Sequence, residues 1–529
     1  MKGILKLCIL FFLITFYSKS EGQIIENSII FEYDGHDINT FIKSLQNERS
    51  SSITWELIGK NTNIYMLHSE DGKTLIDKIR QHKDVVSAQF DAYVEWRNTP
   101  NDPRLNQQYH HALINSFDAW DKTTGGKNSF GQDIVVAVVD EGFYIDHEDL
   151  KDNIYTNSDE IPDDKIDNDG NGFVDDLHGW NMATQKPTHY LRSHGTGVIS
   201  MIGAKGNNAT GIVGMNWNVK ILPLTSNNTV GSVISCYDYI LGERKSFNQS
   251  NGTKGANIVV TNYSGGLSHK FPADQPTWCS LYDKLGAEGI LNVTATSNEN
   301  EDVETVGDLP TLCTSPYLLT VSSTEKNDTR TKESGFGSVS VDVSAPGMKI
   351  LLADVEINGL YSVESGTSFS TPIVAGAAGL IYSYNCPIFQ ELVSFNPSEA
   401  ALVVKNSLIN SVDLLPSLKN LTVSQGRINI NNALNYISGA YNNCGTLFIT
   451  RVYSEQSLTK VFFISSSDIK ADIYITDPTG RIIYSKPSID LLTGEAEYQM
   501  EFAPQSAGIY YLTLIVGKEV QTYAFPVQK

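Results

Sequence analysis

The sequence predicts a multidomain protein whose largest part is an α/β domain, with a largely parallel sheet and helices on both faces. From about Phe117 to Ile437, β-branched segments such as IVVAVV and NIVVTN alternate with stretches of helical periodicity, which is typical of strands buried on both faces. The 529 residues are too many for one ordinary domain, and the 41% hydrophobic content excludes a largely disordered chain. We therefore expect two or three folded units.

The chain begins with a short apolar segment that follows two lysines. Lys2 and Lys6 precede an apolar run from Ile9 to Phe16, and small and polar residues come next, as in a secretory signal peptide. A membrane anchor is the alternative, but the run is much shorter than the roughly 20 residues that span a bilayer. We expect residues 1–22 to direct export, and the mature chain to have no membrane span.

Residues 23–98 are expected to form a compact α+β unit. Between Ser28 and Phe90, the apolar positions switch twice between the period of a strand and that of a helix. By pattern alone, this could be any small binding domain. A polar, turn-rich stretch from Arg97 to Gln108 follows, and a maturation cleavage is expected there because proteases cut exposed segments of this kind. The expected helical faces are Ile38, Phe41, Ile42 and Leu45, and Leu75, Ile76 and Ile79.

The last part of the chain, residues 445–529, has a different pattern. Helical periodicity ends near Thr446, and alternating segments such as ADIYIT and GIYYLTLI are separated by Pro, Gly and Asp turns. The pattern predicts a small β-sandwich.

The net charge and the cysteine content indicate which partners and which cellular compartment to expect. Sixty acidic residues against 39 basic ones give a formal net charge of −21, which argues against a nucleic-acid or anionic-membrane partner. Five cysteines remain if Cys8 leaves with the signal segment, and their wide spacing shows no zinc pattern. We expect one or two disulfides and a buried free thiol in an oxidising compartment. The sequence does not determine which of these cysteines pair: Cys236, Cys279, Cys313, Cys386 and Cys444.

Four segments of the large domain carry residues suited to nucleophilic catalysis. Asp140 ends a buried strand, where its carboxylate can hold an imidazole Nδ1–H, and His194 opens the glycine-framed segment SHGTGVISM. Ser368 in GTSFSTP stands at a helix N-terminus, which favours developing negative charge, and Asn298 in TSNEN can supply a second oxyanion donor. Each alone has a structural explanation, such as a turn-capping Asp or an N-cap Ser. Their order along the chain, Asp, His, Ser, favours catalysis.

These segments, VVDEGFYIDHEDL, SHGTGV, TSNEN and GTSFSTPIVAGAAG, resemble the sequence blocks of the subtilase family, the subtilisin-like serine peptidases, and in particular its thermitase-like members. The likeness spans roughly residues 101–437. It implies a subtilisin-like fold and an acyl-enzyme on Ser368, with His194 as the base, Asp140 as its orienting group and Asn298 in the oxyanion hole. No organic cofactor enters this scheme.

The segment NYSGG, from Asn262 to Gly266, resembles the family's segment that binds the substrate backbone as an added β-strand. The resemblance implies that Ser264, Gly265 and Gly266 contact the substrate. Gly265 stands where a larger residue is common, so a more open S1 wall is expected. Ser297 replaces the glycine that usually precedes the oxyanion Asn.

An acidic segment between Asp140 and His194 has alternating oxygen ligands with Gly172 at the turn, as in calcium loops. The full EF-hand pattern fails because its twelfth position is His178. A solvated acidic loop is the alternative. The segment resembles calcium-binding insertions in thermitase-like subtilases, where the metal is structural. The expected ligands are Asp163, Asp164, Asp167, Asp169, Asn171, the Phe173 carbonyl, Asp175 and Asp176.

The same resemblance implies functions for the two parts of the chain that flank the large domain. Residues 23–98 are similar to the ferredoxin-like propeptide, a foldase and inhibitor whose tail, here Ala92 to Asn98, occupies the substrate cleft of the peptidase domain at 99–440. Residues 445–529 resemble the sorting domain of the type IX secretion system in the Bacteroidetes, which implies a secreted or cell-surface protein of a Gram-negative bacterium. A substrate- or carbohydrate-binding sandwich is the alternative.

We therefore expect a secreted serine endopeptidase that acts on proteins or peptides, binds its own propeptide and processes itself. The alternative is a non-catalytic binding or adhesion protein built on a subtilase scaffold.

Overall fold

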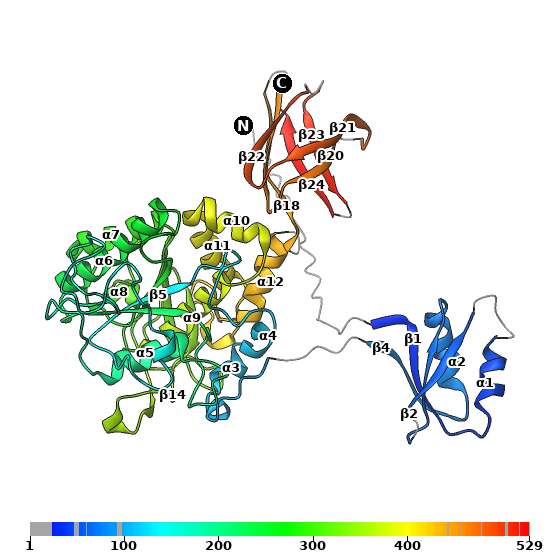
Figure 1. The fold of residues 1–529 in the computed structure, drawn as a ribbon, viewed down its shortest axis with the longest axis horizontal. Coiled ribbons are helices and arrows are strands. Elements are labelled where there is room, and N and C mark those ends of the chain that lie inside the picture. The colour runs from blue at the N-terminus through cyan, green and yellow to red at the C-terminus, as the bar shows by residue number, and fades with distance from the viewer. Residues whose placement is uncertain are drawn as a thin grey trace, which may run out of the picture. The chain divides into compact units, whose positions relative to one another are not determined.

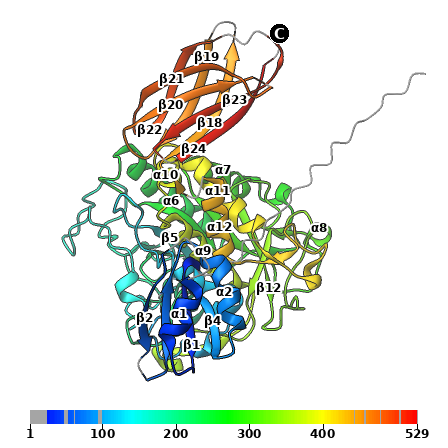
Figure 2. The same ribbon diagram turned by 90° about the vertical axis from the view of Figure 1, so that its right-hand side faces the viewer.

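The computed structural model describes residues 24–46, 52–59, 61–92, 98–441, 444–455, 458–477, 479–502, 506–517 and 519–527. The chain divides into two compact units, Met1–Trp96 and Arg97–Lys529, drawn in Figures 1 and 2. The expected signal segment, residues 1–22, lies outside the described residues, as do residues 93–97 of the expected propeptide tail.

The N-terminal unit is an antiparallel sheet of four strands with two helices packed on one face (Figure 1). Its strand order is β2-β3-β1-β4, the expected ferredoxin-like arrangement. Phe41, Leu45, Leu75 and Ile79 are buried in one core, which confirms the expected helical faces. The elements are β1 (Ile24–Tyr33), α1 (Ile38–Gln46), β2 (Thr54–Gly59), β3 (Ile64–His68), α2 (Gly72–Gln81) and β4 (Val85–Ala92).

The second unit contains a sheet of nine strands in the order β16-β17-β13-β12-β10-β8-β5-β7-β6. Every neighbouring pair is parallel except β16 and β17, which confirms the largely parallel sheet. The strands are β5 (Val135–Asp140), β6 (Trp180–Asn181), β7 (Lys220–Thr225), β8 (Ile258–Tyr263), β10 (Leu291–Ala295), β12 (Leu318–Thr324), β13 (Val343–Pro346), β16 (Asp413–Leu414) and β17 (Gly426–Arg427).

Alternate residues of β5 show how helices cover both faces of this sheet. Val136 and Val138 join a core with residues of α5 and α9, whereas Val135, Ala137 and Val139 join a second core with residues of α6 and α7. The helices are α3 (His110–Leu113), α4 (Ser116–Trp120), α5 (Ser193–Gly203), α6 (Val230–Gln249), α7 (Pro276–Ala287), α8 (Val303–Val306), α9 (Thr367–Tyr382), α10 (Pro387–Phe395), α11 (Pro397–Asn410) and α12 (Ile430–Ala440).

Two small antiparallel pairs lie outside the large sheet: β9 (Leu267–Ser268) with β11 (Asp308–Leu309), and β14 (Ile350–Ala353) with β15 (Tyr361–Glu364). Short 3₁₀ turns occur at η1 (Leu105–Gln107), η2 (Lys151–Asn153), η3 (Pro272–Asp274), η4 (Glu356–Asn358) and η5 (Pro416–Leu418).

The C-terminal part is a sandwich of a three-stranded sheet, β18-β19-β22, and a four-stranded sheet, β21-β20-β23-β24. Side chains from both sheets share one core, as the alternating sequence pattern predicts. The strands are β18 (Leu447–Glu455), β19 (Leu458–Ser465), β20 (Ile469–Thr476), β21 (Ile482–Leu491), β22 (Gly494–Glu501), β23 (Gly508–Val516) and β24 (Glu519–Val527).

Two disulfides join Cys279 to Cys313 and Cys386 to Cys444, and Cys236 is a buried free thiol. The expectation of one or two disulfides and a free thiol is therefore confirmed. Among the described residues, no helix combines the length and the apolar character that crossing a bilayer requires.

Candidate active site

Three neighbouring strands of the large sheet end at one edge and carry polar side chains there. Strands β10, β8 and β5 are adjacent and parallel, so the residues after their carboxyl ends gather together. Asp140 ends β5, Ser264 follows β8, and Asn298 lies just beyond β10. Helices α5 and α9 add His194 and Ser368 from their first turns.

The structure brings Asp140 and His194 into direct contact. The Nδ1 atom of His194 lies 3.0 Å from each carboxylate oxygen of Asp140, and the Glu141 amide donates to Oδ1 at 2.8 Å. The Asp140 side chain is 4% exposed and the His194 side chain 36%. The carboxylate is therefore shielded, and the imidazole stays accessible from outside.

A glycine makes this contact possible. A Cβ added to Gly195 would lie 2.1 Å from the Gly142 carbonyl oxygen and 3.1 Å from the carboxyl carbon of Asp140. Only a residue without a side chain lets the first turn of α5 approach the end of β5 this closely.

The electrostatic surroundings of His194 favour its charged form. Burial lowers the pKa of the imidazole, but the charge and hydrogen bond of Asp140, together with Glu141, outweigh burial and raise the pKa above its ordinary value. The site can therefore stabilise an imidazolium, which a base must become when it accepts a proton from a nucleophile.

Ser368 lies at the N-terminus of α9, and the residue that follows it packs against the imidazole. The ring of Phe369 has its centroid 5.7 Å from that of His194. The Ser368 hydroxyl donates to the Ser264 carbonyl at 3.3 Å, and the Ser264 hydroxyl donates to the Ser368 carbonyl at 2.9 Å. These bonds fix the start of α9 against the loop after β8.

Asn298 is held by the same helix end. Its Oδ1 accepts hydrogen bonds from both the amide and the hydroxyl of Thr367, each at 2.9 Å. Because both bonds go to Oδ1, the Nδ2 group remains available as a donor. Asn298 and Ser368 line one pocket of about 150 Å³, so a carbonyl oxygen held there can meet both the carboxamide and the Ser368 N–H.

The expected substrate-binding residues border this pocket. Ser264, Gly265 and Gly266 line it, and they also line an adjoining hollow of about 360 Å³ that contains Asp140 and His194. A Cβ added to Gly265 would lie 3.0 Å from the ring end of Tyr263. Tyr263 therefore occupies part of the space that the missing side chain leaves.

Residues 131–433, more than half of the chain, match the model of the subtilase family, Peptidase_S8. The chain belongs to the subtilase family. Membership in this family, together with relatives that are named as proteases, supports a serine peptidase.

Subtilisin-like protease 1 of Plasmodium berghei is 26% identical over 466 residues, which cover 79% of this chain and 72% of that protein. An extracellular protease of Xanthomonas campestris is 29% identical over 337 residues, covering 60% of this chain and 55% of that protein. A solved structure described as proteases from Pseudoalteromonas arctica is 26% identical, with a TM-score of 0.48, and covers 64% of this chain and 99% of that one.

The subtilase domain departs from the expected glycine at Ser297, and the structure accommodates the serine. Its amide donates to the Asp308 carboxylate at 3.0 Å, and its carbonyl accepts from the Gly335 amide at 2.8 Å. Ser297 is not among the described non-glycine residues with positive φ. The backbone before Asn298 therefore needs no glycine here.

The acidic segment of the subtilase domain brings carboxylates together. Oxygens of Glu160, Asp169 and Asp176 lie within 4.8 Å of one another. The Asn171 carboxamide donates to Asp169, Asp176 and Glu243 at 3.0 to 3.1 Å. Burial raises the pKa of Asp169, and it raises that of Glu243 to about 7. Oxygen ligands gathered this closely fit a hard cation such as calcium, which would neutralise them.

The structure separates the expected metal ligands into two groups. Asp169 and Asp176 belong to the carboxylate cluster, and Asn171 bridges it by hydrogen bonds. By contrast, Asp167 accepts bonds from the amides of residues 170, 171 and 172.

The other expected ligands lie outside the three-carboxylate cluster. Asp163 is exposed, and Asp164 accepts from the Ile166 amide. Asp175 accepts from the Lys165 amide, and the ring of Phe173 packs against that of Trp180.

Sequence reasoning missed Glu160 and Glu243. Glu160 precedes the loop pattern, and Glu243 lies on α6, far away in sequence. No periodic signal links either residue to the acidic segment.

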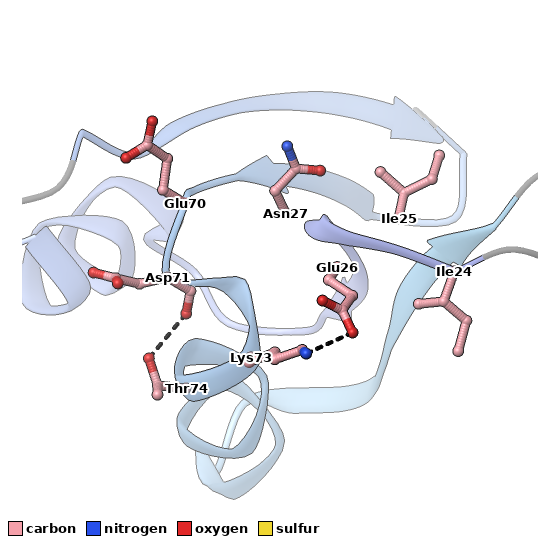
Figure 3. Close-up of a pocket in the computed structure, with 8 residues that line it drawn as sticks. All are labelled: Ile24, Ile25, Glu26, Asn27, Glu70, Asp71, Lys73 and Thr74. Carbon is pink, nitrogen blue, oxygen red and sulfur yellow. Dashed lines mark hydrogen bonds and ion pairs between the residues drawn. The ribbon is translucent and has the colours of Figure 1, made fainter. Parts of the chain in front are cut away.

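A hollow of about 540 Å³ lies in the N-terminal unit, between the start of β1 and the start of α2 (Figure 3). Glu26 and Lys73 form an ion pair at 2.7 Å across it, and both side chains are more than half exposed. The residues that line it include no Ser, Cys or His.

The raised pKa of His194 predicts the acid limb of the pH profile. His194 must be neutral to act as a base, so kcat/KM should fall as pH decreases through an apparent pKa above about 6.5. Because Glu141 contributes to the rise, Glu141→Gln should move this limb to lower pH. The measurement is kcat/KM between pH 5 and 9 on a peptide with Phe at P1.

Asp146→Asn is the matched control, since Asp146 is an exposed acid on the same segment. The control should leave the limb in place. A limb at or below 6.5 in the wild type, or equal shifts in both variants, would contradict the assignment.

Proposed function

We propose that this subtilase is a secreted serine endopeptidase that hydrolyses peptide bonds in proteins through an acyl-enzyme on Ser368. The observation that carries the proposal is the contact of His194 with the buried Asp140 carboxylate, at the strand edge that also holds Ser368 and Asn298.

The first step is the attack of Ser368 on a peptide carbonyl. His194 Nε2 takes the proton of the hydroxyl, and the Ser368 oxygen bonds to the carbonyl carbon, whose oxygen becomes an oxyanion. The Asn298 carboxamide and the Ser368 N–H donate to that oxyanion, while Asp140 stabilises the imidazolium. For this step the Ser368 hydroxyl turns from the Ser264 carbonyl, its partner in the free protein, towards His194.

The C–N bond then breaks as His194 returns the proton to the leaving amine. In the second half, His194 takes a proton from water, the hydroxide attacks the ester carbon, and Ser368 leaves with the proton. An extended substrate would add as a strand to the backbone of Ser264, Gly265 and Gly266. This scheme uses no organic cofactor.

We propose that the chain is a self-processing precursor, with a signal peptide at residues 1–22 and a propeptide at 23–98 before the peptidase domain at 99–440. The support is a separate N-terminal fold with its own core. Asn98 is already anchored on the second unit: it donates to the Trp120 carbonyl at 3.0 Å and to the Asp121 carboxylate. A cut close to this residue would leave the peptidase domain intact.

Secretion is supported by relatives named an extracellular protease in Xanthomonas campestris and an extracellular basic protease in Dichelobacter nodosus. We propose that the sandwich at 445–529 is a type IX sorting domain and that the source is a Gram-negative bacterium. A substrate- or carbohydrate-binding role for the sandwich is the alternative.

The acidic segment is proposed to hold structural calcium, as in thermitase-like subtilases. Glu160, Asp169 and Asp176 would be its carboxylate ligands. Bound calcium would stabilise the loop by offsetting the repulsion among these carboxylates, and it would take no part in the chemical steps.

Ser368→Ala should lower casein hydrolysis by about a million-fold, because it removes the nucleophile. Its precursor should also keep the N-terminal unit, whereas the wild type should lose it. Activity and the mass of the purified chain check both points. Ser370→Ala, two residues further along α9, is the control and should stay active. Equal activity of Ser368→Ala and wild type would rule out Ser368 as the nucleophile, and no activity in either form would favour the non-catalytic binding protein.

Removal of calcium with a chelator should lower the melting temperature of the peptidase by at least about 5 °C, because the folded state binds the ion. Asp169→Asn should lose most of this difference, while the exposed Asp163→Asn should retain it. Calorimetry with and without chelator measures both. A melting temperature that does not change in the wild type would exclude a stabilising metal.

A chain that ends at Cys444 should fail to reach the medium of a bacterium with type IX machinery. Quantitative blots of medium and periplasm measure this, with the full-length Ser368→Ala chain as a control for export without proteolysis. Normal export of the truncated chain would rule out the sorting role and leave the binding role.

A further inference from the structure

The pocket beside Ser368 has a buried carboxylate in its wall. Asp308 lies on β11, which pairs antiparallel with β9 directly after Gly266, so that Asp308 faces Ser268 in the ladder. Asp308 lines the pocket of about 150 Å³ that also contains Asn298 and Ser368. A side chain that entered this pocket from a scissile residue would therefore meet a carboxylate.

The carboxylate is held in place by its own hydrogen bonds. Its Oδ2 atom accepts from the Ser297 amide at 3.0 Å and from the Thr311 hydroxyl at 2.8 Å. The Thr311 hydroxyl also lies 3.4 Å from the Ala295 carbonyl, at the end of β10. The bonds from Ser297 and Thr311 both reach Oδ2, and a ligand in the pocket can approach the other carboxylate oxygen.

The described residues contain no ion pair to Asp308, which is 3% exposed. His269 acts on it electrostatically, but this ring pairs with Glu301 at 2.9 Å. Burial raises the pKa of Asp308 to about 6, although bonds from Thr311 and Ser297 oppose the rise. Above that pH the pocket contains a buried anion, which is unfavourable without a partner.

The rest of the lining suits a long, narrow side chain. Gly265 and Gly266 offer backbone only, and Ala295, Thr296 and Ser297 have small side chains. A Cβ added to Gly266 would lie 2.3 Å from the Leu309 carbonyl oxygen, so this wall must remain a glycine. An aliphatic stem can lie along such walls with its charged end at Asp308.

We propose that this pocket receives the P1 side chain and that Asp308 makes the peptidase selective for Lys or Arg at P1. The proposal rests on the proposed function, because it requires cleavage through Ser368. A basic side chain supplies the positive charge that the buried carboxylate lacks, in the same way that an aspartate in the S1 pocket sets basic specificity in trypsin. A neutral P1 residue leaves the carboxylate without a positively charged partner.

The test compares peptides that differ only in P1, with Lys, Arg, Phe, Leu or Glu, at pH 8. Wild-type enzyme should cleave the Lys and Arg peptides at least about tenfold faster in kcat/KM than the others. Asp308→Asn should lose about 100-fold on Lys and Arg, and should change little on Phe and Leu, because asparagine still accepts from Ser297 and Thr311. Glu333→Gln, an exposed acid outside the pocket lining, is the control and should keep the wild-type profile.

Each outcome separates the two proposals. A wild-type enzyme that cleaves Phe or Leu peptides best overturns the P1 assignment and leaves the endopeptidase function intact. An equal loss of Asp308→Asn on all five peptides makes Asp308 a structural residue and also overturns the assignment. A wild-type enzyme that cleaves no peptide at all refutes the proposed function.

A second measurement needs no variant, in case Asp308→Asn does not fold. Benzamidine, a cationic mimic of arginine, should inhibit the wild type competitively and at least about tenfold more tightly than neutral benzamide. Equal inhibition by both compounds overturns the proposal.

Discussion

The contact between the Asp140 carboxylate and the His194 imidazole is the interaction on which the rest of the site depends. A carboxylate that is 4% exposed at the end of a buried strand needs a partner, and two contacts of 3.0 Å to one nitrogen provide it. The contact requires that α5 begins against β5, which Gly195 permits because a Cβ there would collide with Gly142. The burial and charge of the Asp140 carboxylate and the position of α5 therefore favour the same orientation of the His194 imidazole.

Ser368 and the pocket beside it are held in place by a second set of linked contacts. Thr367 fixes the Asn298 carboxamide at the first turn of α9, and Ser264 fixes Ser368 at the same turn. The Ser297 amide then joins the loop that carries Asn298 to Asp308 in the pocket wall. The residue directly before Asn298 therefore contacts the carboxylate in the pocket wall.

The sequence predicted the layered α/β domain, the α+β unit and the sandwich. In each of them, the spacing of apolar residues along a continuous segment distinguishes strands from helices. It also identified Asp140 and His194, which the structure joins, because strand ends and glycine-framed helix starts have local signatures. Asp308 and Glu243 had no such signature. Asp308 lies in the pocket wall because β11 pairs with β9 over two residues. Glu243 lies on α6 and accepts a hydrogen bond from Asn171 of the acidic segment. Such pairings depend on tertiary packing, which no local pattern contains.

The central claim is that this packing makes Ser368 the reactive nucleophile. The most direct measurement is labelling with a fluorophosphonate, which reacts only with activated serines, followed by peptide mapping in a mass spectrometer. The account predicts stoichiometric modification of the peptide that contains Ser368, and almost none when His194 is replaced by alanine. Modification at another serine, or labelling of Ser368 that does not depend on His194, would contradict it.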